Sequence, residues 1–147
     1  MDFREDGAGP VAGLPPEVGV VLVDHGSRRA AANAMLEEVA RLYAEALAVG
    51  IVEAAHMELA PPSIGDALGR CVGRGARRVV VMPYFLFPGR HSAEDIPRMV
   101  RDAARAYPKL EVRVAEPLGV DPRLGGVVHA RVLECLAGGA EEQLGCD

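Results

Sequence analysis

Short runs of consecutive apolar residues alternate along the chain with longer segments in which apolar residues recur every three or four positions. The runs are typical of strands buried on both faces of a parallel sheet. We expect strands at residues 18–24, 51–59, 77–85 and 110–115. The three-to-four spacing is typical of amphipathic helices. We expect helices at residues 30–49, 63–72, 95–107 and 121–136, the last with an apolar stripe of Leu124, Val127, Val128, Val132, Cys135 and Leu136.

The regular alternation of strands and helices predicts the fold class. Repeated strand-helix-strand units imply a parallel sheet with helices on both faces, because their crossovers are right-handed. For four strands, the common doubly wound order is 2-1-3-4. The sequence therefore predicts an α/β fold, a doubly wound four-stranded parallel sheet in which the first and third strands are neighbours.

Polar residues mark the expected helix starts. Ser63 precedes the second helix and Asp66 follows three positions later, which is a variant of the capping box. Pro97 has no backbone N–H, so the third helix is expected to begin just before it, with Asp95 or Ser92 as its cap. Asp121 caps the last helix.

Length and composition restrict the class of protein. The 147 residues suit one domain, which we expect at residues 17–137, between a Gly- and Pro-rich disordered lead-in at 1–16 and a loose tail at 138–147. A net charge of -5 argues against a nucleic-acid partner, and no apolar run is long enough to cross a membrane. Three scattered cysteines indicate a reducing compartment, the cytoplasm or, after removal of a transit peptide, a plastid.

Two of the expected strands end in the same kinds of polar residue. His25, Ser27 and Arg28 follow the first strand, and the third strand is followed by Arg90, His91 and Ser92. In the order 2-1-3-4 both loops border one crevice, at the switch point where such sheets bind ligands. Glu58, near the end of the neighbouring second strand, is expected to reach the same crevice.

Two imidazoles and a carboxylate suit a divalent iron, cobalt, nickel or zinc ion with open coordination positions. A single histidine after a strand more often caps a helix or fills a core position. Finding His25 and His91 at corresponding strand ends favours a shared metal site, with Glu58 as third ligand.

Other residues of the two loops suit an anionic, flat ligand. Arg28 and Arg90 stand at helix starts, where a cation opposes the helix dipole unless an anion binds beside it. Ser27 and Ser92 either bond that ligand or cap the helices. Leu86 and Phe87 are expected to form an apolar wall against it.

Three stretches of the sequence resemble the signatures of a known family. They read VDHGSRRAAANAML, EAAHMELAPPSIGDAL and PYFLFPGRHSAEDIP. They are similar to those of the sirohydrochlorin chelatases of the CbiX and SirB type, the ATP-independent class II chelatases. The second stretch is closest in wording to the plant-type siroheme ferrochelatases, and the resemblance extends over nearly the whole expected domain.

The resemblance implies a chelatase-like fold and insertion of Fe2+ or Co2+, with Ni2+ also possible, into sirohydrochlorin or a related anionic tetrapyrrole. The product would enter siroheme or cobalamin synthesis. His25, His91 and Glu58 match the family's metal-binding and catalytic positions. One copy of each motif implies the short form, which pairs as a homodimer. Some plant members hold an iron–sulfur cluster in a cysteine-rich tail; only Cys135 and Cys146 lie in that region here, so a cluster is not expected.

Two rival functions remain open at this point. The same fold could serve as a non-catalytic carrier of the metal or the tetrapyrrole. The HGSR stretch also has a superficial likeness to histidine phosphatases, which would make His25 a nucleophile for phosphoryl transfer. Those enzymes need a basic residue directly before the histidine, and Asp24 stands there instead.

Overall fold

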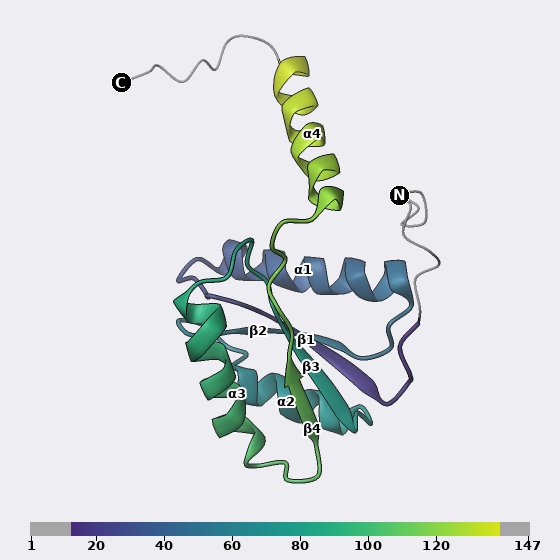
Figure 1. Cartoon of the computed structure of the whole chain (residues 1–147), viewed down its shortest axis with the longest axis vertical. Helices are drawn as coiled ribbons and strands as arrows, with labels where there is room; N and C mark the ends of the chain where they lie inside the picture. The colour runs from purple at the N-terminus through teal and green to yellow at the C-terminus, as the bar shows by residue number, and fades with distance from the viewer. Residues whose placement is uncertain (1–12, 139–147) are drawn as a thin grey trace.

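A computed structural model of the chain describes residues 13–138, with only the backbone at His91 and Ser92. The expected lead-in and tail lie almost wholly outside this range. Four strands form one parallel sheet in the order β2-β1-β3-β4, as predicted (Figure 1). They are β1 (Val18–Asp24), β2 (Val52–His56), β3 (Arg78–Pro83) and β4 (Glu111–Val114). The last three are shorter than expected, because loop residues such as Phe85 also pack against the core and prolong the apolar run.

Helices cover both faces of the sheet, but unequally. The helical elements are α1 (Ala30–Leu47), α2 (Ile64–Gly73), the π-helical turn η1 (His91–Asp95), α3 (Ile96–Ala104) and α4 (Pro122–Ala137). On one face α1 packs against β2 and β1, and on the other α2 packs against β2 and β1 while α3 packs against β4 (Figure 1). Among the described residues, no helix is long and apolar enough to span a bilayer.

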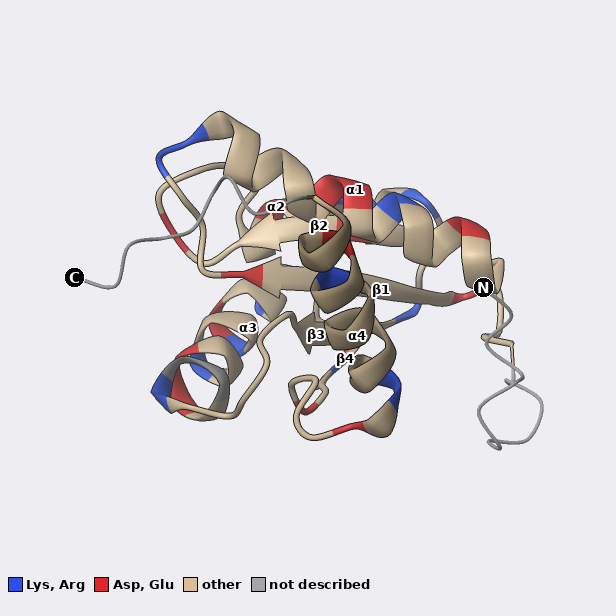
Figure 2. Cartoon of the chain, turned by 90° about the horizontal axis from the view of Figure 1, so that it is seen from above, with Lys and Arg blue, Asp and Glu red and all other residues tan. Residues whose placement is uncertain are grey.

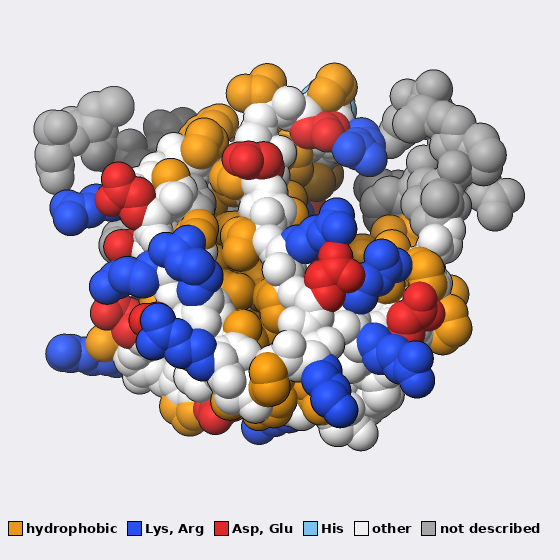
Figure 3. Space-filling view, turned by 60° about the horizontal axis from the view of Figure 1, so that its bottom comes forward, with side chains coloured by type: hydrophobic (Ala, Val, Ile, Leu, Met, Phe, Trp, Pro, Cys, Tyr) orange, Lys and Arg blue, Asp and Glu red, His pale blue; other side chains and the backbone are white. Residues whose placement is uncertain are grey.

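Surface charges of both signs lie close together. On α1, Arg41 forms ion pairs with Glu38 and Glu45, and Figure 2 shows acidic and basic positions side by side on this helix. Figure 3 shows basic and acidic side chains interspersed on another face of the molecule. On the surfaces in view, the charges are mixed rather than separated by sign.

The core is complete on one face of the sheet only. Val79 and Val81 of β3 are 1% and 0% exposed, on the side covered by α2 and α3. Val80 and Met82 point to the α1 side and are only half-buried. The expectation that β3 is buried on both faces is therefore wrong for this chain taken alone, because α1 lies over β1 and β2 and does not reach across the sheet.

The position of α4 also differs from the expectation. Its apolar stripe was expected to pack on the sheet, yet none of its residues is buried. Figure 1 shows the helix projecting away from the rest of the domain. The segment before it is tied to the loop after β3, since Leu118 N–H donates to the carbonyl oxygen of Phe85 at 2.9 Å. From there the chain leaves the sheet instead of folding back over it.

All three predicted helix starts are confirmed, including that of α3 at Ile96, just before Pro97, but only two of the three predicted caps are. Ser63 Oγ accepts from Asp66 N–H at 3.0 Å and the Asp66 carboxylate accepts from Ser63 N–H at 3.0 Å, a reciprocal capping box. Asp121 accepts from Arg123 N–H at 2.9 Å. The cap at Asp95 is wrong: its φ of -72° and ψ of -47° are helical, because the π-turn from His91 runs directly into α3.

Candidate functional site

The ends of β1 and β3 bring two loops to the same edge of the sheet. Val23 is paired with Pro83, and Tyr84 N–H donates to the carbonyl oxygen of Val23 at 2.7 Å. Beyond this pair, one strand continues into His25 and the other into the loop that reaches His91. This edge, at the carboxyl ends of parallel strands, is where doubly wound sheets bind ligands.

Hydrogen bonds between backbone and side-chain groups hold the loop after β1 in one shape. Gly26 has a φ of 92°, and its N–H donates to Asp24 Oδ1 at 3.0 Å. Ser27 N–H donates to Asn33 Oδ1 at 2.9 Å, and Asn33 Nδ2 donates back to the Ser27 carbonyl at 2.7 Å. A Cβ at Gly26 would collide with the carbonyl oxygen of Glu58. Only glycine fits this close crossing, so the loop is a fixed support for His25.

The His25 ring is half-buried against an aromatic side chain of the neighbouring loop. Its centroid lies 6.4 Å from that of Phe85, with an interplanar angle of 78°. This edge-to-face arrangement is a favoured aromatic geometry, and it restricts how the imidazole can turn. His25 is thus oriented by a residue that follows β3, across the boundary between the two loops.

The backbone of Glu58 lies beside the backbone of His25. Its N–H donates to the carbonyl oxygen of His25 at 3.3 Å, and its side chain is exposed. It lies just beyond β2, which ends at His56 rather than at residue 59 as expected. An exposed carboxylate at this edge suits both a metal ligand and a proton acceptor, since both need access to a bound ligand.

His91 opens the π-helical turn η1, and Arg90 and Ser92 flank it. Ala93 N–H donates to the carbonyl oxygen of Gly89 at 2.9 Å, which starts the turn. Short π-helical insertions are frequent at functional sites. Arg90 is exposed, with Nε 3.7 Å from Glu94. Among the side chains that the structure describes, no group of three or more His, Cys, Asp and Glu is arranged to hold a metal, so the set His25, Glu58 and His91 stays a prediction.

Ser27 has a local structural role. Its Oγ accepts from Arg29 N–H at 3.0 Å, where Arg29 is the residue before α1. Arg28 beside it is exposed. Leu86 and Phe87, in the loop before η1, are 58% and 64% exposed. Large apolar side chains at a polar edge are typical of a binding surface.

A pair between the buried His56 and the half-buried Asp24, beneath the loop, was not predicted. Asp24 Oδ1 lies 2.6 Å from His56 Nδ1, and His56 is 1% exposed. The same oxygen accepts from Gly26 N–H, so the pair ties the ends of β1 and β2 to the His25 loop. His56 Nε2 has no hydrogen-bond partner among the described residues. The strand register that places Asp24 opposite His56 cannot be read from either segment alone.

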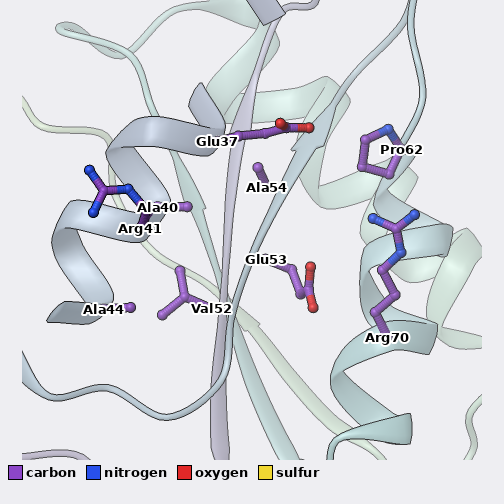
Figure 4. A pocket seen from close by; sticks show the side chains of 9 residues that line it. All are labelled: Glu37, Ala40, Arg41, Ala44, Val52, Glu53, Ala54, Pro62 and Arg70. Carbon is purple, nitrogen blue, oxygen red and sulfur yellow. The ribbon is translucent and has the colours of Figure 1, made fainter. Parts of the chain in front are cut away.

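A separate groove of about 340 Å³ lies along the edge strand β2, between α1 and α2 (Figure 4). Ala40, Val52 and Ala54 form part of its wall, and charged residues surround it. Its lining contains no histidine or cysteine. Its residues suggest no metal chemistry.

The sheet order and the loops at its carboxyl edge define the class of the protein: a doubly wound parallel α/β domain with a histidine-bearing candidate ligand site. The family model described as CbiX matches residues 19–135, and the chain belongs to this family. The fold is shared with the crystal structure of a putative cobalamin (vitamin B12) biosynthesis CbiX protein from Marinobacter aquaeolei VT8, at a TM-score of 0.70 and 33% identity, over 83% of this chain and 99% of that one.

Two further relatives connect the fold with chelatases. The chain is 47% identical to the chloroplastic sirohydrochlorin ferrochelatase of Arabidopsis thaliana, over 91% of this chain and 61% of that protein's length. The sirohydrochlorin chelatase SirB from Bacillus subtilis subspecies spizizenii, solved in complex with cobalt, is 26% identical at a TM-score of 0.70, over 80% of this chain and 50% of that one. The chain thus spans only part of these two relatives.

Proposed function

We propose that the protein is a sirohydrochlorin chelatase, which inserts Fe2+ or Co2+ into the tetrapyrrole without ATP. The main support is the fixed loop at His25, which shares the carboxyl edge of the sheet with the turn that begins at His91. The family and the two chelatase relatives supply the reaction class. Siroheme or cobalamin synthesis would consume the product.

The metal enters as substrate, held by His25, His91 and Glu58. Neutral imidazoles and a carboxylate bind iron, cobalt or nickel while leaving coordination positions open for the pyrrole nitrogens. Insertion releases two protons from the ring as the ion forms its bonds to nitrogen. Glu58 is the proposed first proton acceptor, because its carboxylate is exposed at this edge and general-base work needs a group within about 3 Å or one water.

The substrate's properties match the loop residues. Its carboxylates would pair with Arg28 and Arg90, whose exposed guanidinium groups suit planar anions. Leu86 and Phe87 would contact the face of the ring. Ser92 would bond a carboxylate, whereas Ser27, already bonded to Arg29 N–H, would hold the loop. An iron–sulfur cluster has no role in this proposal.

The working unit that we propose is a homodimer in a reducing compartment, the cytoplasm or a plastid. The family resemblance favours the dimer. The chloroplastic relative favours the plastid, and the free thiols of Cys71 and Cys135 suit any reducing compartment. Neither a nucleic acid nor a membrane is a proposed partner.

The test is an anaerobic assay with sirohydrochlorin and either Fe2+ or Co2+, followed by absorbance and corrected for the reaction without protein. We expect the spectrum to shift to that of the metallated ring without ATP. His25→Ala and His91→Ala should each slow the shift by about 100-fold or more, whereas His129→Ala, an exposed histidine on α4, should not.

Two results would count against the proposal. Metal binding without any acceleration of the shift would indicate a carrier instead of an enzyme. Unchanged rates in both histidine variants would remove the proposed metal site. Running both metals in competition would also measure the preference between iron and cobalt, which the ligand types alone do not determine.

A further inference from the structure

His56 is a buried polar side chain to which the proposed reaction gives no role. Among the side chains that the structure describes, it is the one polar or charged group that is almost wholly buried, at 1% exposed. Its Nδ1–H donates to Asp24 Oδ1 at 2.6 Å, because a carboxylate oxygen accepts, and its Nε2 has no partner among the described residues. A buried nitrogen without a partner costs stability, so stability alone does not explain a histidine at this position.

His56 also closes the short loop that bears Glu58. Its backbone N–H donates to the carbonyl oxygen of Pro62 at 2.9 Å, so the loop formed by residues 56–62 begins and ends at His56. Leu59, directly after Glu58, has a φ of 71°, in the left-handed region. A residue other than glycine keeps such a conformation only where the surrounding structure holds it. The loop therefore needs a fixed base, and His56 lies at that base.

Asp24 connects this base with the loop that bears His25. One of its carboxylate oxygens, Oδ1, accepts from both His56 Nδ1 and the Gly26 N–H, so it bridges the two loops. The loops are in close contact here, since a Cβ added at Gly26 would lie 3.2 Å from His56 Cβ. His25 follows Asp24 directly, and Glu58 comes two positions after His56. The pair thus lies at the foot of two proposed metal ligands.

The backbone bonds between the two loops weaken toward these ligands. Met57 N–H donates to the carbonyl oxygen of Asp24 at 2.9 Å, but Glu58 N–H lies 3.3 Å from that of His25. N–H···O bonds in proteins are usually about 2.7–3.2 Å long, so the second bond is a weak one. Hydrogen bonds to a carboxylate are shorter and roughly twice as strong as neutral ones. Of these three contacts, the bond between His56 and Asp24 is therefore the strongest.

We propose that His56 is a positioning residue for the metal: its bond to Asp24 holds the two loops at the spacing at which His25 and Glu58 can bind one ion. This rests on the proposed function, because it requires His25 and Glu58 to be ligands. His56 itself is too buried to reach a bound ion and acts through Asp24. Ligands must be held to within about 0.5 Å of their working geometry, which a weak backbone bond alone does not ensure.

The test compares His56→Asn with His56→Leu. The two replacements have the same branched shape, but only asparagine carries an N–H at the place of Nδ1 and can still donate to Asp24. In a Co2+ titration followed by visible absorbance, His56→Asn should bind within about threefold of the unaltered protein, and His56→Leu about tenfold more weakly. In the sirohydrochlorin assay, kcat should fall in His56→Leu while KM changes less than about twofold, because Arg28 and Arg90 are unaltered.

Val79→Ala is the control for a loss of stability alone. Val79 is 1% exposed and is paired with Gly19, at the amino end of β3. Its replacement should lower the midpoint of urea unfolding without weakening Co2+ binding. Should His56→Leu fail to fold, Asp24→Ala removes the same bond from its half-buried side, and it should also weaken Co2+ binding by about tenfold.

Two results would overturn the inference. The first is equal Co2+ affinity in His56→Leu and His56→Asn, or in Asp24→Ala and the unaltered protein. The second is a loss of affinity in Val79→Ala as large as that in His56→Leu, because binding would then follow stability. In both cases an unaltered protein that binds Co2+ and metallates sirohydrochlorin would leave the proposed function standing. An unaltered protein that did neither would remove both.

Discussion

At the scale of single residues, the site depends on how the His25 loop is supported. Gly26, Asp24 and Asn33 fix the backbone on either side of His25, and Phe85 restricts its ring. The histidines could be selected from the sequence because they follow two apolar runs. The residues that support the His25 loop could not be selected in this way. Asp24 and His56 meet only because of the register between β1 and β2, which depends on the tertiary fold.

Gly26→Ala should disable the site with limited damage to the rest of the fold. The added Cβ meets the Glu58 carbonyl, and the φ of 92° is unfavourable for alanine, so we expect roughly 1–3 kcal/mol of lost stability and loss of metal binding. Urea unfolding and Co2+ titration measure the two effects. Gly50→Ala is the control, because a Cβ added at Gly50 would meet no atom within 4 Å. Equal behaviour of the two variants would contradict the role given to Gly26.

The Asp24–His56 pair should behave as one unit. Replacing His56 by Phe leaves the Asp24 carboxylate without its buried partner, which should cost roughly 1–3 kcal/mol of unfolding free energy. Asp24→Asn alone should also destabilise, and the double variant should cost clearly less than the sum of the two. Strictly additive losses in a double-mutant cycle would mean that the two side chains act separately.

At the scale of elements, local sequence signals predicted where helices begin better than they predicted which helix covers which face of the sheet. The capping box at Ser63 and the cap at Asp121 involve bonds within three residues, so the sequence contains all of their information. Pro97 correctly indicated the start of α3 at Ile96, but the cap expected at Asp95 is absent, because a π-helical turn leads directly into the helix. The apolar run of β3 correctly indicated burial, but no run of residues tells whether the covering helix comes from the same chain.

Ser63→Ala should cost about 1 kcal/mol of unfolding free energy, since it leaves the N–H of Asp66 without its side-chain acceptor. The backbone N–H of Ser63 is the main cause of the lowered pKa of Asp66, followed by its hydroxyl. A lowered folded pKa stabilises the fold above the unfolded value near 4, and this contribution is lost as the pH falls through the folded pKa. Asp66→Asn should therefore flatten the pH dependence of unfolding below about pH 4, and an unchanged acid limb would contradict it.

At the scale of the whole molecule, one sheet face and one helix are each incomplete. The half-buried Val80 and Met82 and the exposed stripe of α4 are the two places where the fold departs from its sequence pattern. Both departures have the same physical explanation if the missing contact is made by a second copy. The doubly wound order itself was predictable, because 2-1-3-4 is the common arrangement of four alternating strands with right-handed crossovers.

Val128→Asp should make the protein monomeric without unfolding it. Val128 is 63% exposed in the single chain, so a charge there costs the isolated fold little, but it would be buried if the exposed α4 lies in the interface of the proposed homodimer. Arg131→Gln, on the polar side of α4 where Arg131 pairs with Glu134, should remain dimeric. Sedimentation velocity with circular dichroism measures both. Equal masses for the two variants would argue against an interface at α4.

In the proposed function, His25 and His91 hold one metal ion at the carboxyl edge of the sheet. Anomalous diffraction from crystals soaked in Co2+ tests it most directly. We expect a cobalt ion with imidazole nitrogens of both histidines at roughly 2.1 Å, and with coordination positions left open. Cobalt bound at another place, or by only one of the two histidines with the other turned away, would contradict it.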